Sequence, residues 1–108
     1  MRYEVILLQP AVDFLREVEV KLRARAFRTI ELLKEFGPFL KEPHLKKISG
    51  VKGLFELRVQ QGNNICRLFY FHRENRIFII TSGYIKKTMK TNRNEIEKAV
   101  KIMEHYNG

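Results

Sequence analysis

The chain has 108 residues, of which 44% are hydrophobic, and 21 Lys and Arg against 12 Asp and Glu give a formal net charge of +9. This apolar content excludes a disordered chain, and a chain of this length buries roughly 65% of its unfolded surface, so we expect one domain over residues 1–108. The excess of positive charge suits a polyanion or an acidic protein partner, with a generically basic soluble protein as the alternative.

Targeting and membrane signals are absent from the sequence. The short apolar run near the start ends at Pro10, and no stretch approaches the eighteen or more apolar residues of a membrane span. The single cysteine, Cys66, lies inside an apolar run, so we expect a buried thiol, no intrachain disulfide and a reducing environment. These features predict a cytoplasmic protein with no membrane partner.

The patterns of common cofactor sites are also missing. His44, His72 and His105 are far apart and, with one cysteine, do not form a zinc-binding pattern. The chain has no P-loop, no GxGxxG turn and no GxSxG motif. We therefore expect neither a metal nor a cofactor.

The first third of the chain predicts one strand and two helices. Residues 3–8 are β-branched and apolar around one charge, and Pro10 ends this run. Residues 11–36 have helical spacing, and because one helix of that length is unusual in a small domain, we expect a break near residues 21–26. Gly37-Pro38 ends the second helix, and residues 37–53, rich in glycine, proline and lysine, predict a loop.

The rest of the chain predicts an antiparallel meander and a closing helix. LFELRVQ alternates with period two, and Gly62-Asn63-Asn64 favours a hairpin turn. ICRLFYFH and RIFIITS are apolar on both faces, as in interior strands. Asn92 is a suitable cap for a last helix. The fold class is therefore α+β: a strand, a helical hairpin, a three-stranded antiparallel meander and a C-terminal helix, with the first two helices on one face of the sheet.

Three charged residues of the hairpin are candidates for a binding site. Glu56 and Arg58 share the polar face of one strand, and counting back from the turn brings Arg58 close to Arg67 on the next strand. A charge in the middle of an apolar central strand is costly unless it is paired or opens onto a functional cleft. An ordinary Glu56–Arg67 ion pair that holds the hairpin together is the alternative.

The stretch SGYIKKTMKT follows the last strand directly and has three lysines and no acid. We expect Gly83 to turn the chain over the sheet edge, so that Lys86, Lys87 and Lys90 lie at one end of the sheet that contains Arg67. Fixed cations over an open sheet face suit a phosphodiester, because they stabilise the charge that develops in its transition state. A solubilising loop is the alternative.

Four stretches follow one another in this order: GLFELRV, RLFYF, RIFIITSGYIKKTMKT and NEIEKAVKIMEHY. In these stretches the chain resembles the toxins of the RelE/ParE superfamily of toxin–antitoxin systems, in particular the HigB-like, phage-derived branch. The resemblance covers the whole chain and implies a RelE-like fold that is similar to small microbial ribonucleases. It also implies an mRNA endoribonuclease (mRNA interferase) that acts in the ribosomal A site and inhibits translation. The reaction would be metal-independent attack of a ribose 2′-hydroxyl on the adjacent phosphate.

The resemblance also implies roles for single residues. It places Arg58, Arg67, Lys86 and Lys87 in the catalytic set, and the RNA-binding set is Lys46, Lys47, Glu56, Tyr84 and Lys90. The chain departs from the family pattern because no C-terminal His or Tyr stands clearly at an acid/base position. His105 and Tyr106 lie near the end of the last helix, and Tyr84, Tyr70 and His72 are the other candidates. The general acid is therefore unassigned.

The implied partners are a cognate antitoxin, usually of the helix-turn-helix type, and the ribosome with its mRNA. Two alternatives stay open: a non-enzymatic, ParE-like inhibitor of DNA gyrase, and an RNA- or ribosome-binding module that does not cleave.

Overall fold

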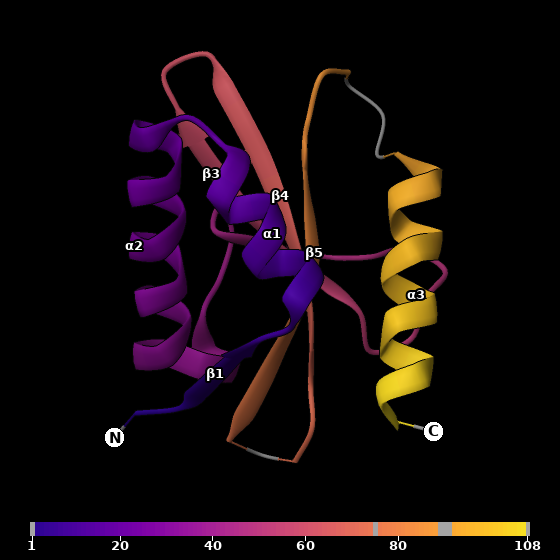
Figure 1. Ribbon diagram of the computed structural model, residues 1–108. Helices are drawn as coiled ribbons and strands as arrows, with labels where there is room; N and C mark the ends of the chain where they lie inside the picture. Colours follow the sequence, from indigo (N-terminus) through magenta and orange to yellow (C-terminus); the bar gives the residue numbers. More distant parts are fainter. Residues whose placement is uncertain (1, 75, 89–91, 108) are drawn as a thin grey trace.

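The computed structural model describes residues 2–74, 76–88 and 92–107 (Figure 1). In chain order, the elements are β1 (Glu4–Leu7), α1 (Gln9–Glu17), α2 (Val20–Phe36), a 3-10 turn (Gly37–Phe39), β2 (Leu45–Lys47), β3 (Phe55–Gln61), β4 (Asn64–His72), β5 (Ile77–Ile85) and α3 (Arg93–Asn107).

The strands form one five-stranded sheet in the order β1-β5-β4-β3-β2. β1 pairs with β5 in parallel, and the other pairs are antiparallel. Helices α1 and α2 cover one face of the sheet and α3 lies on the other, as Figure 1 shows. The predicted α+β class, the meander and the placement of the first two helices on one face are confirmed.

The two N-terminal helices separate earlier than the sequence predicted. The break lies at Val18 and Glu19, not near residues 21–26. The Glu19 carboxylate caps α2 by accepting hydrogen bonds from the backbone N–H groups of Lys21 and Leu22, at 3.0 and 3.1 Å. Arg23 donates to the carbonyl oxygens of Leu15, Arg16 and Val18 at the end of α1. Side-chain capping therefore sets the break, and apolar periodicity does not reveal it.

The basic segment after α2 is more regular than the predicted loop. Gly37 ends α2 with a φ of 53°, which confirms the predicted stop. Three residues of this segment, Leu45–Lys47, then pair with β3 as the edge strand β2. So short a strand has too little periodicity to be recognised in sequence, and it exists because β3 offers an open edge.

Strand β5 continues to Ile85, so the predicted turn at Gly83 was wrong. Tyr84 pairs with Arg67 and Gly83 with Leu68, within the regular β4–β5 ladder and before its last pair, Cys66 with Ile85. A Cβ atom at Gly83 would lie 2.6 Å from the Phe14 ring and 2.7 Å from Leu68. The glycine is therefore needed for the close approach of α1 to the sheet, and not for a change of direction.

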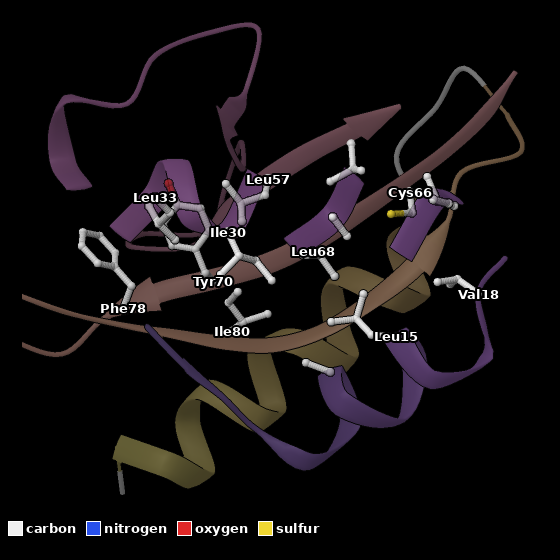
Figure 2. Packing of buried hydrophobic residues seen from close by; sticks show 14 of the residues in the cluster. Leu15, Val18, Ile30, Leu33, Leu57, Cys66, Leu68, Tyr70, Phe78 and Ile80 are labelled. Carbon is white, nitrogen blue, oxygen red and sulfur yellow. The ribbon is translucent and has the colours of Figure 1, made fainter. Parts of the chain in front are cut away.

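Two cores lie on the two faces of the sheet. The larger one packs α1 and α2 against alternate residues of the strands, among them Leu57, Leu68 and Ile80 (Figure 2). Cys66 belongs to it and is fully buried, as predicted, and burial raises its pKa to about 12. The smaller core joins Phe69 and Tyr84 to Ala99 of α3.

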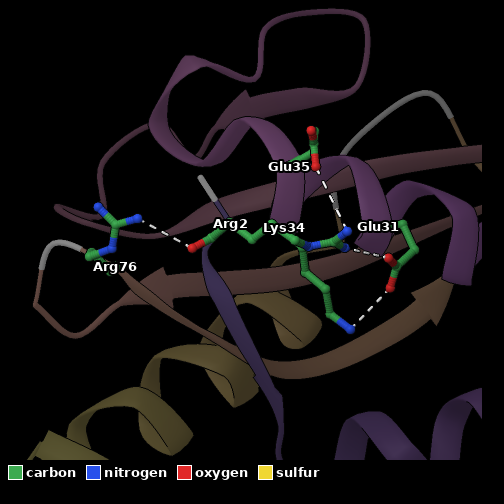
Figure 3. A network of polar contacts seen from close by, with 5 residues as sticks. All are labelled: Arg2, Glu31, Lys34, Glu35 and Arg76. Atoms are coloured by element: carbon green, nitrogen blue, oxygen red, sulfur yellow. Dashed lines mark hydrogen bonds and ion pairs between the residues drawn. The ribbon is translucent and has the colours of Figure 1, made fainter.

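The start of the chain is tied to α2 by a surface network of charges. Arg2 contacts Glu31 at 2.8 Å and Glu35 at 3.9 Å, and Lys34 contacts Glu31 at 3.0 Å (Figure 3). Arg2, Glu31 and Glu35 are largely exposed, so water and salt screen these pairs and each contributes little to stability. Within the described residues, no helix is both long enough and apolar enough to cross a membrane.

Candidate functional site

Two neighbouring rows of paired residues cross the sheet and bring the polar candidates together. In one row Lys46 pairs with Glu56 and Glu56 with Phe69; in the next, Arg58 pairs with Arg67 and Arg67 with Tyr84. Paired residues on adjacent strands share a face, and Phe69 and Tyr84 belong to the core under α3. The polar members of both rows therefore occupy the α3 face of the sheet, and the direct Arg58–Arg67 pairing agrees with the count from the hairpin turn.

Arg67 is a buried cation at the centre of this face. Its side chain is only 6% exposed, and its Nε lies 3.6 Å from Oε1 of Glu56, which is 4% exposed. Its Nη1 donates to the carbonyl oxygen of Cys66 at 3.3 Å. Burial lowers the pKa of Arg67, Glu56 raises it, and the cation of Arg58 lowers it again. The Glu56–Arg67 ion pair considered from sequence is thus present, but it is longer than a hydrogen bond.

Two buried polar atoms of this face have no hydrogen-bond partner among the described residues. They are Oε2 of Glu56 and Nε of Arg67, whereas the phenolic oxygen of Tyr84 lies near the backbone N–H of Asn92. A buried polar atom left unpaired costs about 1–3 kcal/mol, and native structures contain few of them. Two such atoms in neighbouring rows of the sheet indicate a site that binds a polar group of a ligand.

Lys86 joins the face from the end of β5. Its backbone N–H donates to the carbonyl oxygen of Ile65 at 2.8 Å, which holds it beside β4 just past the last strand pair. Burial lowers the pKa of Lys86, and Arg67, Arg58 and Lys46 add to this effect, while Glu56 opposes it. A lysine among cations loses its proton more easily, so Lys86 is suited to proton transfer as well as to anion binding.

The other predicted residues differ in placement. Lys46 is exposed on the α3 face, whereas Lys47 pairs with Phe55 and so lies on the opposite face. Lys87 is exposed one residue beyond Lys86, and Lys90 lies outside the described residues. The structure therefore brings Lys46, Glu56, Arg58, Arg67, Tyr84 and Lys86 together and separates Lys47 from them.

Among the candidate acids, Tyr84 alone lies next to Arg67 in the described part of the sheet. It is 7% exposed, and its ring stacks on Phe69 with centroids 5.6 Å apart. Burial raises the pKa of Tyr84 and Glu56 raises it further, while the backbone N–H of Asn92 and the cation of Arg67 oppose this effect. Tyr70 belongs to the core on the opposite face, and Tyr106 accepts a hydrogen bond from Arg73 at 2.8 Å.

A cavity of about 330 Å³ adjoins this face at the outer edge of β3. Arg58 and Arg67 line it, together with Arg25 and Arg28 of α2. Sequence patterns assign no role to these two helix arginines, because charges on a helix surface carry no distinguishing signal. Within the described ranges, no group of His, Cys, Asp and Glu side chains could hold a metal ion.

Solved structures share this architecture. E. coli toxin RelE, as a mutant with two arginines replaced by alanine in the free state, is 19% identical, with a TM-score of 0.68 over 94% of this chain and 97% of that one. The archaeal RelE–RelB complex from Pyrococcus horikoshii is 21% identical, with a TM-score of 0.59 over 79% of this chain and 96% of that one. The intact E. coli RelBE toxin–antitoxin complex is 14% identical, with a TM-score of 0.60 over 80% of this chain and 99% of that one.

These likenesses define the class of protein: the chain has the RelE toxin fold. It belongs to the family of Gp49-like phage-derived proteins (DUF891), whose sequence profile matches residues 13–104. No curated protein sequence matches the chain significantly.

Proposed function

We propose that this chain is the toxin of a toxin–antitoxin pair, in the HigB-like branch, and that it is a ribosome-dependent endoribonuclease acting on mRNA in the cytoplasm. The observation behind this proposal is the two-row arrangement on the α3 face. It gathers Arg58, Arg67 and Lys46, with Lys86 beside them at the end of β5, around buried polar atoms that lack protein partners in the described part of the chain. A phosphodiester supplies both the negative charge and the hydrogen-bonding oxygens that such a face requires.

In the reaction that we propose, the ribose 2′-oxygen attacks the adjacent phosphorus, and the bond from phosphorus to the 5′-oxygen of the next nucleotide breaks. The 2′-hydroxyl proton passes to a base, with Lys86 and Glu56 as the candidates, and the leaving 5′-oxygen takes up a proton. Arg58 and Arg67 bind the non-bridging oxygens, where negative charge increases in the transition state. The products are a 2′,3′-cyclic phosphate and a free 5′-hydroxyl, and no metal or cofactor takes part.

Two of the similar structures are complexes of a RelE with its RelB. By analogy, we propose a cognate antitoxin for this chain, of the helix-turn-helix type common among HigB-like pairs. A basic face that cuts mRNA harms its own cell unless a partner neutralises it, and +9 of formal charge suits an acidic binding segment.

The test is primer extension on a translated mRNA after induction of the chain. We expect codon-associated ends, and a decrease of about 10²–10³-fold in cleavage for Arg67→Ala, the range typical of removing one transition-state donor. Because Arg67 is buried beside Glu56, Arg58→Ala provides a second, half-exposed variant that keeps the core. Arg16→Ala, which removes an exposed cation of α1, is the matched control and should cleave like the wild type.

The alternatives predict other outcomes. If the folded wild type produces no codon-associated ends and inhibits gyrase supercoiling, the ParE-like function holds. If it binds RNA in a salt-sensitive way without producing ends, the chain is a binding module. Growth arrest that survives in both Arg67→Ala and Arg58→Ala would rule out the proposed site.

A further inference from the structure

The cavity at the edge of β3 connects the α3 face with the helical layer. β2 pairs with β3 only as far as Leu57, and the last backbone hydrogen bond on this side is the Arg58 N–H donating to the His44 carbonyl at 2.8 Å. Beyond this point the outer edge of β3 is open, and Val59 and Gln60 line the cavity there. On the other side, α2 provides Arg25 and Arg28. The cavity thus begins at Arg58 and Arg67 and passes around the strand to α2.

The charged residues that line this cavity are all cations. Four of its lining residues are arginines, and none of the described residues that line it is acidic. The side chain of Arg28 has no hydrogen-bond or ion-pair partner in the described part of the chain, and that of Arg25 has only Gln61 there, at a long 3.4 Å. Elsewhere on α2, by contrast, Lys34 has an acidic partner and Arg23 is bound to three carbonyl groups. Arginines that converge without counter-charge favour an anion as the occupant.

A second cavity of about 220 Å³ continues the same path along α2. It shares Arg25 and Arg28 with the first, and Lys21 lies on its wall. Again, none of the described lining residues is acidic. A row of spaced cations on a helix, continuous with the arginines of the sheet face, matches an extended polyanion better than a single small anion.

We propose that the cavity lined by Arg25, Arg28, Arg58 and Arg67 is a second phosphate subsite, which holds a neighbouring phosphodiester of the same single-stranded RNA whose scissile phosphate lies on the α3 face. This inference rests on the proposed function and extends it, because it gives the RNA strand a path from the sheet face around the open edge of β3 to α2. Arg58 and Arg67 line both places, so two successive phosphates share them. Arg25 and Arg28 orient the strand and take no part in the reaction itself.

The experiment uses the full chain and non-cleavable 2′-O-methyl RNA, as an octanucleotide and as a dinucleotide with a single phosphate. The test variant is Arg25→Ala/Arg28→Ala; both side chains are exposed, so the fold should persist, as circular dichroism will check. We expect octanucleotide affinity to fall about tenfold and dinucleotide affinity to stay unchanged, because the single phosphate occupies the α3 face. The slope of log affinity against log salt should fall by about 0.7 for each phosphate that the variant no longer neutralises.

A control variant that removes the same number of cations distinguishes RNA binding in the cavity from the general attraction of RNA to a basic protein. Arg16→Ala/Lys101→Ala removes two exposed cations that line neither cavity, and it should bind the octanucleotide nearly as the wild type does. As single changes in the wild type, Arg28→Lys should keep part of the octanucleotide affinity, and Arg28→Glu should lower it the most. Equal decreases in affinity for the test and control pairs would reduce the effect to net charge and overturn the subsite.

The outcomes also distinguish this proposal from the proposed function. If the test pair binds the octanucleotide normally, the subsite is wrong even where wild type and variant both cut translated mRNA. If the pair binds the octanucleotide normally and fails only to co-sediment with ribosomes, the cavity holds ribosomal RNA and not the substrate strand. If octanucleotide affinity falls as expected while the wild type produces no codon-associated ends, the subsite stands and the endoribonuclease function fails.

Discussion

The guanidinium of Arg67 is only 6% exposed, in a central strand, so its removal from water costs free energy. The ion pair with Glu56, at 3.6 Å, offsets only part of this desolvation cost. The rest of its hydrogen-bonding capacity faces a surface that Arg58 and Lys86 make positive. A bound phosphate oxygen would satisfy Nε of Arg67 and offset the repulsion among these cations. The features that make the residue costly in the free protein therefore suit it to anion binding.

Cys66 provides a pH-dependent test of burial at the residue scale. Its pKa is raised from 9.0 to about 12 by burial, so the folded state keeps the thiol neutral where the unfolded chain ionises. Below pH 9 the thiol is neutral in both states and the free energy of unfolding keeps its full value. As the pH rises from 9 toward 12, the thiol ionises only in the unfolded chain, and the free energy of unfolding falls. Relative to Cys66→Val, we expect the free energy of unfolding of the wild type to fall by up to about 1.4 kcal/mol per pH unit above pH 9.

Urea unfolding of both proteins between pH 7 and pH 11 measures this difference. The comparison cancels the titration of lysines and tyrosines common to the two proteins. Parallel profiles would show that the thiol is not buried as described.

At the scale of elements, the packing of α1 on β5 depends on Gly83. A methyl group there would lie 2.6 Å from the ring of Phe14 and 2.7 Å from Leu68. We expect Gly83→Ala to lower the free energy of unfolding by about 1–3 kcal/mol, because the helix must shift or the ring must leave its rotamer. Urea denaturation measures the change.

A double-mutant cycle makes this prediction specific. Phe14→Leu removes the ring that the new methyl group would meet, so Gly83→Ala should cost less in that background than in the wild type. Additive effects of the two changes would show that the contact with Phe14 does not determine the cost of the methyl group.

At the scale of the whole molecule, the net charge of +9 opposes compactness. The molecule measures 34 × 32 × 24 Å, while the Debye length falls from about 30 Å at 10 mM salt to about 8 Å at 150 mM. Charges on opposite sides thus repel each other at low salt and are screened at physiological salt. We expect Tm to rise across this range of NaCl, as differential scanning fluorimetry will measure.

The variant Arg25→Glu/Arg28→Glu replaces two cations by two anions and should have a smaller rise in Tm over the same range. A rise as large as that of the wild type would attribute the effect to salt in general and not to self-repulsion.

Sequence reasoning predicted the local part of the site. A two-residue turn at Gly62 and Asn63 sets the register of β3 and β4, so Arg58 could be placed opposite Arg67 by counting. The resemblance to RelE-like toxins was also readable, because strand, turn and cap signals follow one another in a fixed order. Lys47 could not be assigned to the opposite face, since its strand has three residues and its orientation comes from its partner.

The sequence by itself determined the α+β class, the two central strands, the helix that Asn92 caps and the excess of positive charge, because each depends on neighbours along the chain. Tertiary structure alone decided that β5 continues through Gly83, that β2 leaves the edge of β3 open, and that Arg25 and Arg28 of α2 meet Arg58 there. These features depend on residues that lie far apart in the chain. Pairing and packing bring such residues together only when the sheet and its helices assemble.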